Sequence, residues 1–195
     1  MTPAELDRLM NGPLADLSDP AEVVRSERVY EGRVWDIRRD RFRFGDHELE
    51  RDYVDHTGAV AVLARSADDR VLLINQYRHP IRSRDWELPA GLLDVDGEDP
   101  LAAARRELAE EVDLVAADWS ELIVFATSPG GSDEVIRVYE ARGLSAAPEA
   151  FARTEEEAEI LLRWVPLSEA VEAALAGRIR NSILLVAVLA AHARG

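Results

Sequence analysis

Two long apolar runs near the middle of the chain place the strongest constraint on its fold. Residues 58–64 and 71–76 are almost continuously apolar, and a polar turn at residues 66–69 separates them. Continuous runs of this length are typical of strands whose two faces are both buried. We therefore expect two buried strands, joined as a hairpin, inside a sheet that other elements cover.

The order of the other elements then limits the fold class. Strands, a helix, further strands and further helices follow one another, which favours a mixed-sheet α/β (α+β) domain over a doubly wound parallel sheet. We expect the sheet to be sandwiched between helices. The expected strands are residues 86–91, 121–126, 135–142 and 161–165, and the expected helices are residues 100–112, 167–176 and 181–193.

The first part of the chain has a different character. Residues 1–22 are interpreted as a flexible arm with a short helix at 4–10, and residues 23–56 as a small antiparallel sheet. Its strands are expected at residues 27–30, 33–38, 41–44 and 49–54. Phe42 and Phe44 alternate with arginines, which predicts one apolar and one basic face. Residues 57–195 then form the main domain.

Composition excludes several classes of protein. A formal net charge of −15 argues against nucleic-acid binding, which needs a basic face. The chain has no cysteine, so disulfides and thiol chemistry are excluded. The longest apolar stretch, residues 183–191, is far shorter than the roughly 20 residues of a membrane span, and no signal peptide is visible. We expect a soluble, cytoplasmic protein.

The expected helix at residues 100–112 carries the clearest chemical signal. Asp99 can cap its N-terminus, and Pro100 suits its first position. Apolar residues then recur at helical spacing and form a buried stripe: Leu101, Ala104, Leu108 and Val112.

Three glutamates share another face of this helix. Glu107 and Glu111 are four residues apart, and Glu110 lies one turn along from Glu107. Like charges at this spacing repel, and a cation between them turns that cost into a binding site. Clustered carboxylate oxygens suit Mg²⁺ or Mn²⁺. The alternative is a glutamate-rich face that is only solvated.

The residues around these glutamates resemble the signature of the Nudix hydrolases, a glycine loop followed by a helix that ends in REUxEExGU, where U is a bulky aliphatic residue. The matching positions are Gly91, Glu98, Arg106-Glu107-Leu108, Glu110-Glu111 and Leu114. Two departures are present. The spacing from Gly91 to Glu98 is one residue longer, which indicates an insertion in the loop 93–97, and Asp113 replaces a glycine. Asp tolerates the left-handed backbone expected there.

Further motifs resemble the ADP-ribose pyrophosphatase branch of this family. They are Arg51-Asp52, residues 76–80, residues 86–91, residues 128–134 and Pro129, which stands sixteen residues after Asp113. The resemblance implies Mg²⁺-dependent hydrolysis of ADP-ribose to AMP and ribose 5-phosphate, and a homodimer that exchanges the N-terminal sheet. The same chemistry on another nucleoside diphosphate derivative is the first alternative. A module that senses a nucleotide without cutting it is the second.

The resemblance also implies roles for the glutamates and their neighbours. Glu107 and Glu111 would be metal ligands, Glu110 would assist, and the carbonyl of Ala90 would add an oxygen. Arg106 would orient the glutamates through charge-assisted hydrogen bonds.

The loop 128–134 would supply the general base. Glu134 is our choice, because the loop can fold over the substrate like a lid. Asp133 is the alternative base and a candidate substrate contact. Without the family, Glu134 would be interpreted as a solvated turn residue.

Several other residues are candidates for binding the nucleotide. Arg51 and Arg78 would contact phosphate or the terminal sugar, and Glu87 would accept hydrogen bonds from hydroxyl or amino groups. Surface ion pairs are the alternative for both arginines. Tyr77 and Trp86 would stack on the base or belong to the core. His79 is interpreted as a turn residue, and residues 155–157, three glutamates, as an acidic loop that is either solvated or near the metal.

Overall fold

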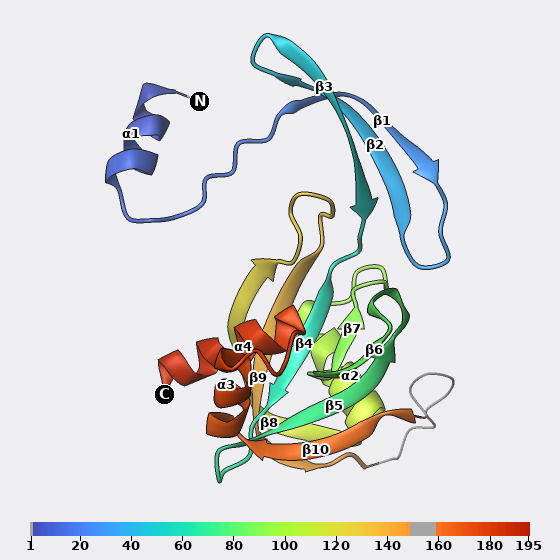
Figure 1. The fold of residues 1–195 in the computed structure, drawn as a ribbon, viewed down its shortest axis with the longest axis vertical. Coiled ribbons are helices and arrows are strands. Elements are labelled where there is room, and N and C mark those ends of the chain that lie inside the picture. Colours follow the sequence, from blue (N-terminus) through green and yellow to red (C-terminus); the bar gives the residue numbers. More distant parts are fainter. Residues whose placement is uncertain (1, 149–158) are drawn as a thin grey trace. The chain divides into compact units, whose positions relative to one another are not determined.

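The computed structural model describes residues 2–148 and 159–195, and the chain divides into two units, Met1–Asp55 and His56–Gly195. None of the helices in the described ranges is both long and apolar enough to cross a membrane. Figure 1 shows the elements of each unit.

The N-terminal unit is a helix followed by an antiparallel sheet, as the sequence predicts. The helix is α1 (Pro3–Asn11), and the sheet has the order β1-β2-β3, with β1 at Glu22–Tyr30, β2 at Asp36–Phe44 and β3 at His47–Asp55. The two short strands expected at residues 33–38 and 41–44 form one strand, β2. Gly45, with φ of 59°, allows the tight reversal from β2 to β3.

The arginines of β2 form ion pairs along one face of this sheet. Arg39 contacts Asp52 at 2.6 Å, and Arg41 contacts Glu50 at 2.9 Å, each directly across the ladder in β3. Arg43 reaches Glu22 of β1 at 3.0 Å. The face that the alternation predicts to be basic is therefore lined by paired charges, because the register places an acid near each of these arginines.

The described residues of the second unit form two sheets. A mixed four-stranded sheet has the order β7-β4-β9-β8, in which β4 and β9 are parallel and the other pairs are antiparallel. An antiparallel sheet has the order β10-β5-β6. The bounds are β4 Ala59–Ala64, β5 Arg70–Arg78, β6 Ser83–Glu87, β7 Ala90–Leu92, β8 Leu114–Ala126, β9 Val135–Ala146 and β10 Leu161–Pro166, with a short 3-10 helix η1 at His79–Ile81.

The two apolar runs are buried strands, but the hairpin expected between them is wrong. β4 and β5 belong to different sheets, and only an isolated bridge between Arg65 and Val71 joins their ends. Each strand is central in its sheet: β4 lies between β7 and β9, and β5 lies between β6 and β10. Because both strands find partners on both edges elsewhere, they separate after the turn.

Helices cover both faces of β4, which confirms the predicted fold class. Alternate residues of β4 enter two different cores. Ala59, Ala61 and Leu63 pack in the core with α3 (Leu167–Leu175) and α4 (Ser182–Arg194), whereas Val60, Val62 and Ala64 pack in the core with α2 (Pro100–Val112). A strand buried on both faces must be apolar at every position, which accounts for the continuous run.

Candidate active site

Helix α2 has the boundaries that the sequence predicts. The Asp99 carboxylate accepts hydrogen bonds from the backbone N–H groups of Leu101 (3.0 Å) and Ala102 (3.2 Å). The helix ends at Asp113, which adopts the expected left-handed conformation with φ of 56° and ψ of 35°. The apolar stripe of α2 is buried, so its glutamates lie on the sides toward β7 and solvent.

The carboxylate of Glu107 lies directly against the backbone of Gly91 in β7. A Cβ atom at residue 91 would stand 2.0 Å from both Cδ and Oε1 of Glu107. Only glycine leaves room for this contact, so the glycine of the signature is explained by the position of Glu107.

Glu111 joins the same strand one helical turn further along. Its side chain is buried, and Oε2 accepts a hydrogen bond of 2.9 Å from the backbone N–H of Ala90. Glu107 and Glu111 therefore lie against two consecutive residues of β7. The structure brings together Ala90, Gly91, Glu107 and Glu111, and their role as a metal site stays a prediction.

Arg106 forms hydrogen bonds with three glutamates, one of which is Glu107. Its guanidinium donates to both carboxylate oxygens of Glu98 (3.1 and 3.0 Å), and one nitrogen, Nη1, also donates to Glu107 (2.6 Å) and Glu110 (3.1 Å). The hydrogen bonds with Glu98 raise the pKa of Arg106 and hold the pKa of Glu98 below its ordinary value. Glu98 reaches this position because the inserted loop closes in a turn, with φ of 76° at Gly97. Arg106 thus orients the carboxylates.

The donors at this place suit a hard divalent cation. Three carboxylates contact the Arg106 guanidinium, and Glu111 lies one helical turn from Glu107. The set carries a formal charge of −3: Glu98, Arg106, Glu107, Glu110 and Glu111. Carboxylate and carbonyl oxygens are the ligands that Mg²⁺ and Mn²⁺ prefer. Within residues 2–148 and 159–195, no three acidic or histidine side chains converge as a ready-made metal site. The glutamates contact Arg106 and the backbone N–H of Ala90.

Arg78 and Glu87, both predicted to contact substrate, are paired with each other. Nε and Nη2 of Arg78 donate to the two oxygens of Glu87 at 3.0 and 2.8 Å. Glu87 is buried, whereas the Arg78 side chain is 46% exposed. Glu87 lies opposite Ile74 in the β5–β6 ladder, and Ile74 belongs to the core that includes α2. Glu87 and Ile74 therefore lie on the face of this sheet that is turned to that core.

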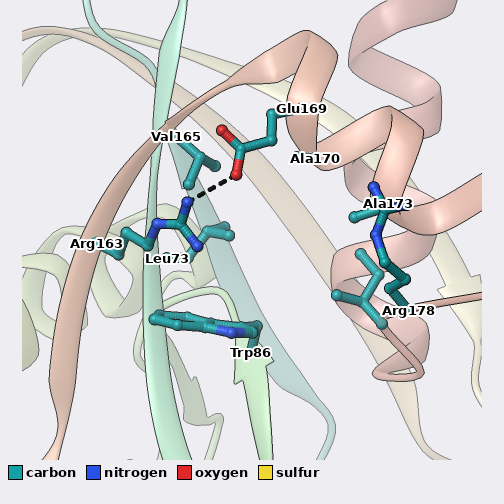
Figure 2. A pocket seen from close by; sticks show the side chains of 9 residues that line it. Leu73, Trp86, Arg163, Val165, Glu169, Ala170, Ala173 and Arg178 are labelled. Carbon is teal, nitrogen blue, oxygen red and sulfur yellow. Dashed lines mark hydrogen bonds and ion pairs between the residues drawn. The ribbon is translucent and has the colours of Figure 1, made fainter.

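Trp86 points to the other face of this sheet. It lies opposite Asn75 in the ladder and packs with Leu73 in the core beside α3. Figure 2 shows Trp86 beneath the guanidinium of Arg163, 6.0 Å from the ring centre, while Arg163 bonds Glu169 at 2.7 Å. These side chains line a cavity of about 190 Å³. Trp86 therefore packs on the side of the sheet where α3 lies, away from the glutamates of α2.

Tyr77 and His79 form an exposed pair at the end of β5. The Tyr77 hydroxyl and Nδ1 of His79 are 3.3 Å apart, and the rings meet edge to face. His79 begins the turn η1, as the sequence predicts.

Glu134 and Asp133 are anchored by residues that the sequence reasoning missed. Thr127 Oγ1 donates to Glu134 Oε2, and Nε2 of His56 lies 3.3 Å from Glu134 Oε1. Asp133 Oδ1 accepts a 2.8 Å hydrogen bond from the backbone N–H of His56. A single histidine before β4 carries no recognisable pattern, so the sequence offered no signal for it.

The functional roles of all these residues stay predictions, and two further candidates lie elsewhere in the chain. Arg51 lies in β3 of the N-terminal unit, where it donates to the carbonyl of Glu50 at 2.7 Å, and its contact with substrate remains a prediction. The three glutamates at residues 155–157 lie outside the described residues.

Comparison with known proteins identifies the family. The NUDIX domain model matches residues 55–185. The chain is 45% identical to the ADP-ribose pyrophosphatase of Mycobacterium tuberculosis over 88% of its own length and 83% of that protein. It is 36% identical to the methanol dehydrogenase activator of Bacillus methanolicus, over 86% and 90% of the two chains. A crystal structure of an ADP compounds hydrolase superposes with a TM-score of 0.74 at 20% identity, covering 92% of this chain and 96% of that one.

The chain therefore belongs to the Nudix family, and the prediction of a Nudix hydrolase is confirmed.

Proposed function

We propose that this protein is a cytoplasmic enzyme that hydrolyses the pyrophosphate bond of ADP-ribose to AMP and ribose 5-phosphate, with Mg²⁺ or Mn²⁺ as cofactor. The observation that carries the proposal is the seating of Glu107 and Glu111 against Gly91 and Ala90. The choice of ADP-ribose is supported by the 45% identity to the ADP-ribose pyrophosphatase of M. tuberculosis over most of both chains.

The cation would be held by the glutamates of α2. Glu107 and Glu111 are the proposed ligands, with Glu110 assisting and the Ala90 carbonyl adding an oxygen. A bound divalent cation neutralises phosphate oxygens and helps align attack on phosphorus. Arg106 limits the positions of Glu107 and Glu110 through its hydrogen bonds, so it sets the geometry of the ligands.

Glu134 is the proposed general base. It accepts a proton from the attacking water as the water oxygen bonds phosphorus and the bridging P–O bond breaks. Its side chain is 25% exposed, which lets water reach it, while contacts from Thr127 and His56 restrict its orientation. Asp133, one oxygen of which accepts a hydrogen bond from the backbone N–H of His56, stays the alternative base.

Arg78 is the proposed phosphate contact on the main unit, because its side chain is 46% exposed and its partner Glu87 lies on the sheet face turned to the core that includes α2. Glu87 would fix Arg78 and, through it, the phosphate. Arg51 is proposed to contact phosphate or the terminal sugar, on the resemblance alone.

We also propose a homodimer formed through the N-terminal sheet. Several large apolar side chains of this unit are exposed, which is unfavourable for a free surface: Val23, Val29, Tyr30, Trp35 and Phe44. Light scattering on the full chain should give a mass twice the 21.7 kDa of one chain. Phe44→Glu should lower the measured mass toward that of one chain. A wild-type mass of one chain would exclude the dimer.

A turnover assay on a nucleotide panel tests the activity. ADP-ribose, nucleotide sugars, oxidised nucleotides and dinucleotides are incubated with Mg²⁺, and the products are separated by chromatography. AMP and ribose 5-phosphate at the highest kcat/KM would support the proposal. Faster cleavage of another compound would keep the chemistry and replace the substrate. Tight binding without cleavage of any compound would favour a sensing module instead.

A further inference from the structure

His56 is a buried histidine whose two ring nitrogens both have partners. Only 4% of its side chain is exposed. Nδ1 accepts a 2.9 Å hydrogen bond from the backbone N–H of Gly58. A nitrogen that accepts carries no proton, so the proton of the neutral ring is on Nε2. Nε2 lies 3.3 Å from Oε1 of Glu134, which places its proton close to this carboxylate.

The Glu134 carboxylate is consequently held from two sides. Thr127 donates to Oε2, and Nε2 of His56 lies 3.3 Å from Oε1. Each carboxylate oxygen has two lone pairs, so one on each remains for a water molecule. The two donors together restrict rotation of the carboxylate and define where those lone pairs point.

The position of His56 is itself tied to the loop that carries Glu134. The backbone N–H of His56 donates to Asp133, the residue before Glu134. The hydrogen bond from Gly58 to Nδ1 fixes the tilt of the ring as well as its tautomer. The backbone and the ring of His56 therefore contact two consecutive residues of one loop.

We propose that His56 is a positioning residue for catalysis: its Nε2–H aims the Glu134 carboxylate at the attacking water. This role rests on the proposed function, in which Glu134 is the base. It differs from a merely structural role, because a buried histidine that only fills space would affect folding without acting through Glu134.

Two substitutions separate the two contacts of the ring. In His56→Asn, the amide sits where Nδ1 was, so it can still accept from Gly58 but cannot reach Glu134. In His56→Gln, the longer side chain carries an N–H donor to about the place of Nε2. We expect His56→Asn to lower kcat about tenfold or more, the factor associated with one hydrogen bond to a charged group, with KM within about twofold. His56→Gln should keep kcat within about threefold of wild type.

A double-mutant cycle with Glu134→Gln tests whether His56 acts through Glu134. Glu134→Gln alone should lower kcat by roughly 10²- to 10⁴-fold, the usual contribution of a general base. In that background His56→Asn should lower kcat little further, because the side chain that His56 positions no longer accepts a proton. Thermal melting of each variant reports on the fold, and His192→Asn, an exposed histidine in α4, is the matched control.

The outcomes are distinguishable. A full-speed Glu134→Gln variant overturns the assignment of the base and this inference with it. If Glu134→Gln is slow, two results would show that His56 does not position Glu134. One is a folded His56→Asn variant with wild-type kcat. The other is a loss of kcat from His56→Asn that is as large in the Glu134→Gln background as in the wild type. If His56→Asn does not fold, His56→Gln decides: a folded His56→Gln variant that has lost tenfold or more in kcat overturns the proposal.

Discussion

Substituting Gly91 by alanine should damage activity far more than stability. The added Cβ would stand 2.0 Å from Cδ and Oε1 of Glu107, whereas real Cβ contacts are essentially never under 3.0 Å. The Glu107 carboxylate must therefore move by about 1 Å or more. Since the clashing atoms include the end of a flexible side chain, rotation can relieve the contact, and we expect the free energy of unfolding to fall by only about 1 kcal/mol.

The loss of activity follows from the same displacement. A misplacement of about 1 Å in a catalytic group costs on the order of 10²-fold, so kcat/KM for ADP-ribose should fall by about that factor. The measurement pairs steady-state kinetics across a Mg²⁺ titration with thermal melting.

The double variant Gly91→Ala/Glu107→Ala provides the control. It should be no less stable than Glu107→Ala, because the clashing side chain is gone. A folded Gly91→Ala enzyme with near wild-type kcat/KM would refute the reasoning, since the position of Glu107 would then not matter for turnover.

Three further predictions concern charges in the same unit. Glu111→Gln should abolish turnover and weaken Mn²⁺ binding, which calorimetry measures. The fold should survive, because the amide retains an acceptor for the N–H of Ala90. Near-normal activity would show that Glu111 is not a metal ligand. Arg78→Ala should destabilise the protein by about 1–2 kcal/mol in denaturant unfolding, because it leaves Glu87 buried without its ion-pair partner. Adding Glu87→Gln should restore stability. If Arg78 also binds phosphate, the KM for the nucleotide should stay raised in both variants. The pKa of Glu98 is lowered from 4.5 by Arg106, so the carboxylate stabilises the fold at higher pH and this contribution is lost as pH falls below about 4.5. Glu98→Gln should flatten that part of the stability profile, and an unchanged acid limb would contradict the pairing.

The local features of α2 could be predicted because they depend on residues close together in the chain. The cap at Asp99, the left-handed turn at Asp113 and the shared face of Glu107 and Glu111 follow from helical geometry over a few residues. Tertiary packing did not have to be known for any of them. The glutamate face of the site was therefore visible in the sequence.

Pairings between distant strands could not be predicted in the same way. The apolar runs of β4 and β5 indicated buried strands, but an apolar strand fits any central position, so the hairpin was the wrong choice of partner. The register of β5 and β6 also decided that Trp86 faces α3 while Glu87 faces the α2 side and bonds Arg78.

The family, the fold class and the helix that carries the carboxylates follow from the amino-acid sequence alone, because helical spacing and a dense motif are local properties. What those carboxylates touch depends on the folding of distant segments against one another. This folding sets Glu107 against Gly91, turns Arg106 to Glu98, and places His56 beside Glu134. Such contacts depend on which strands pair and in what register, and these are set by packing of the whole unit.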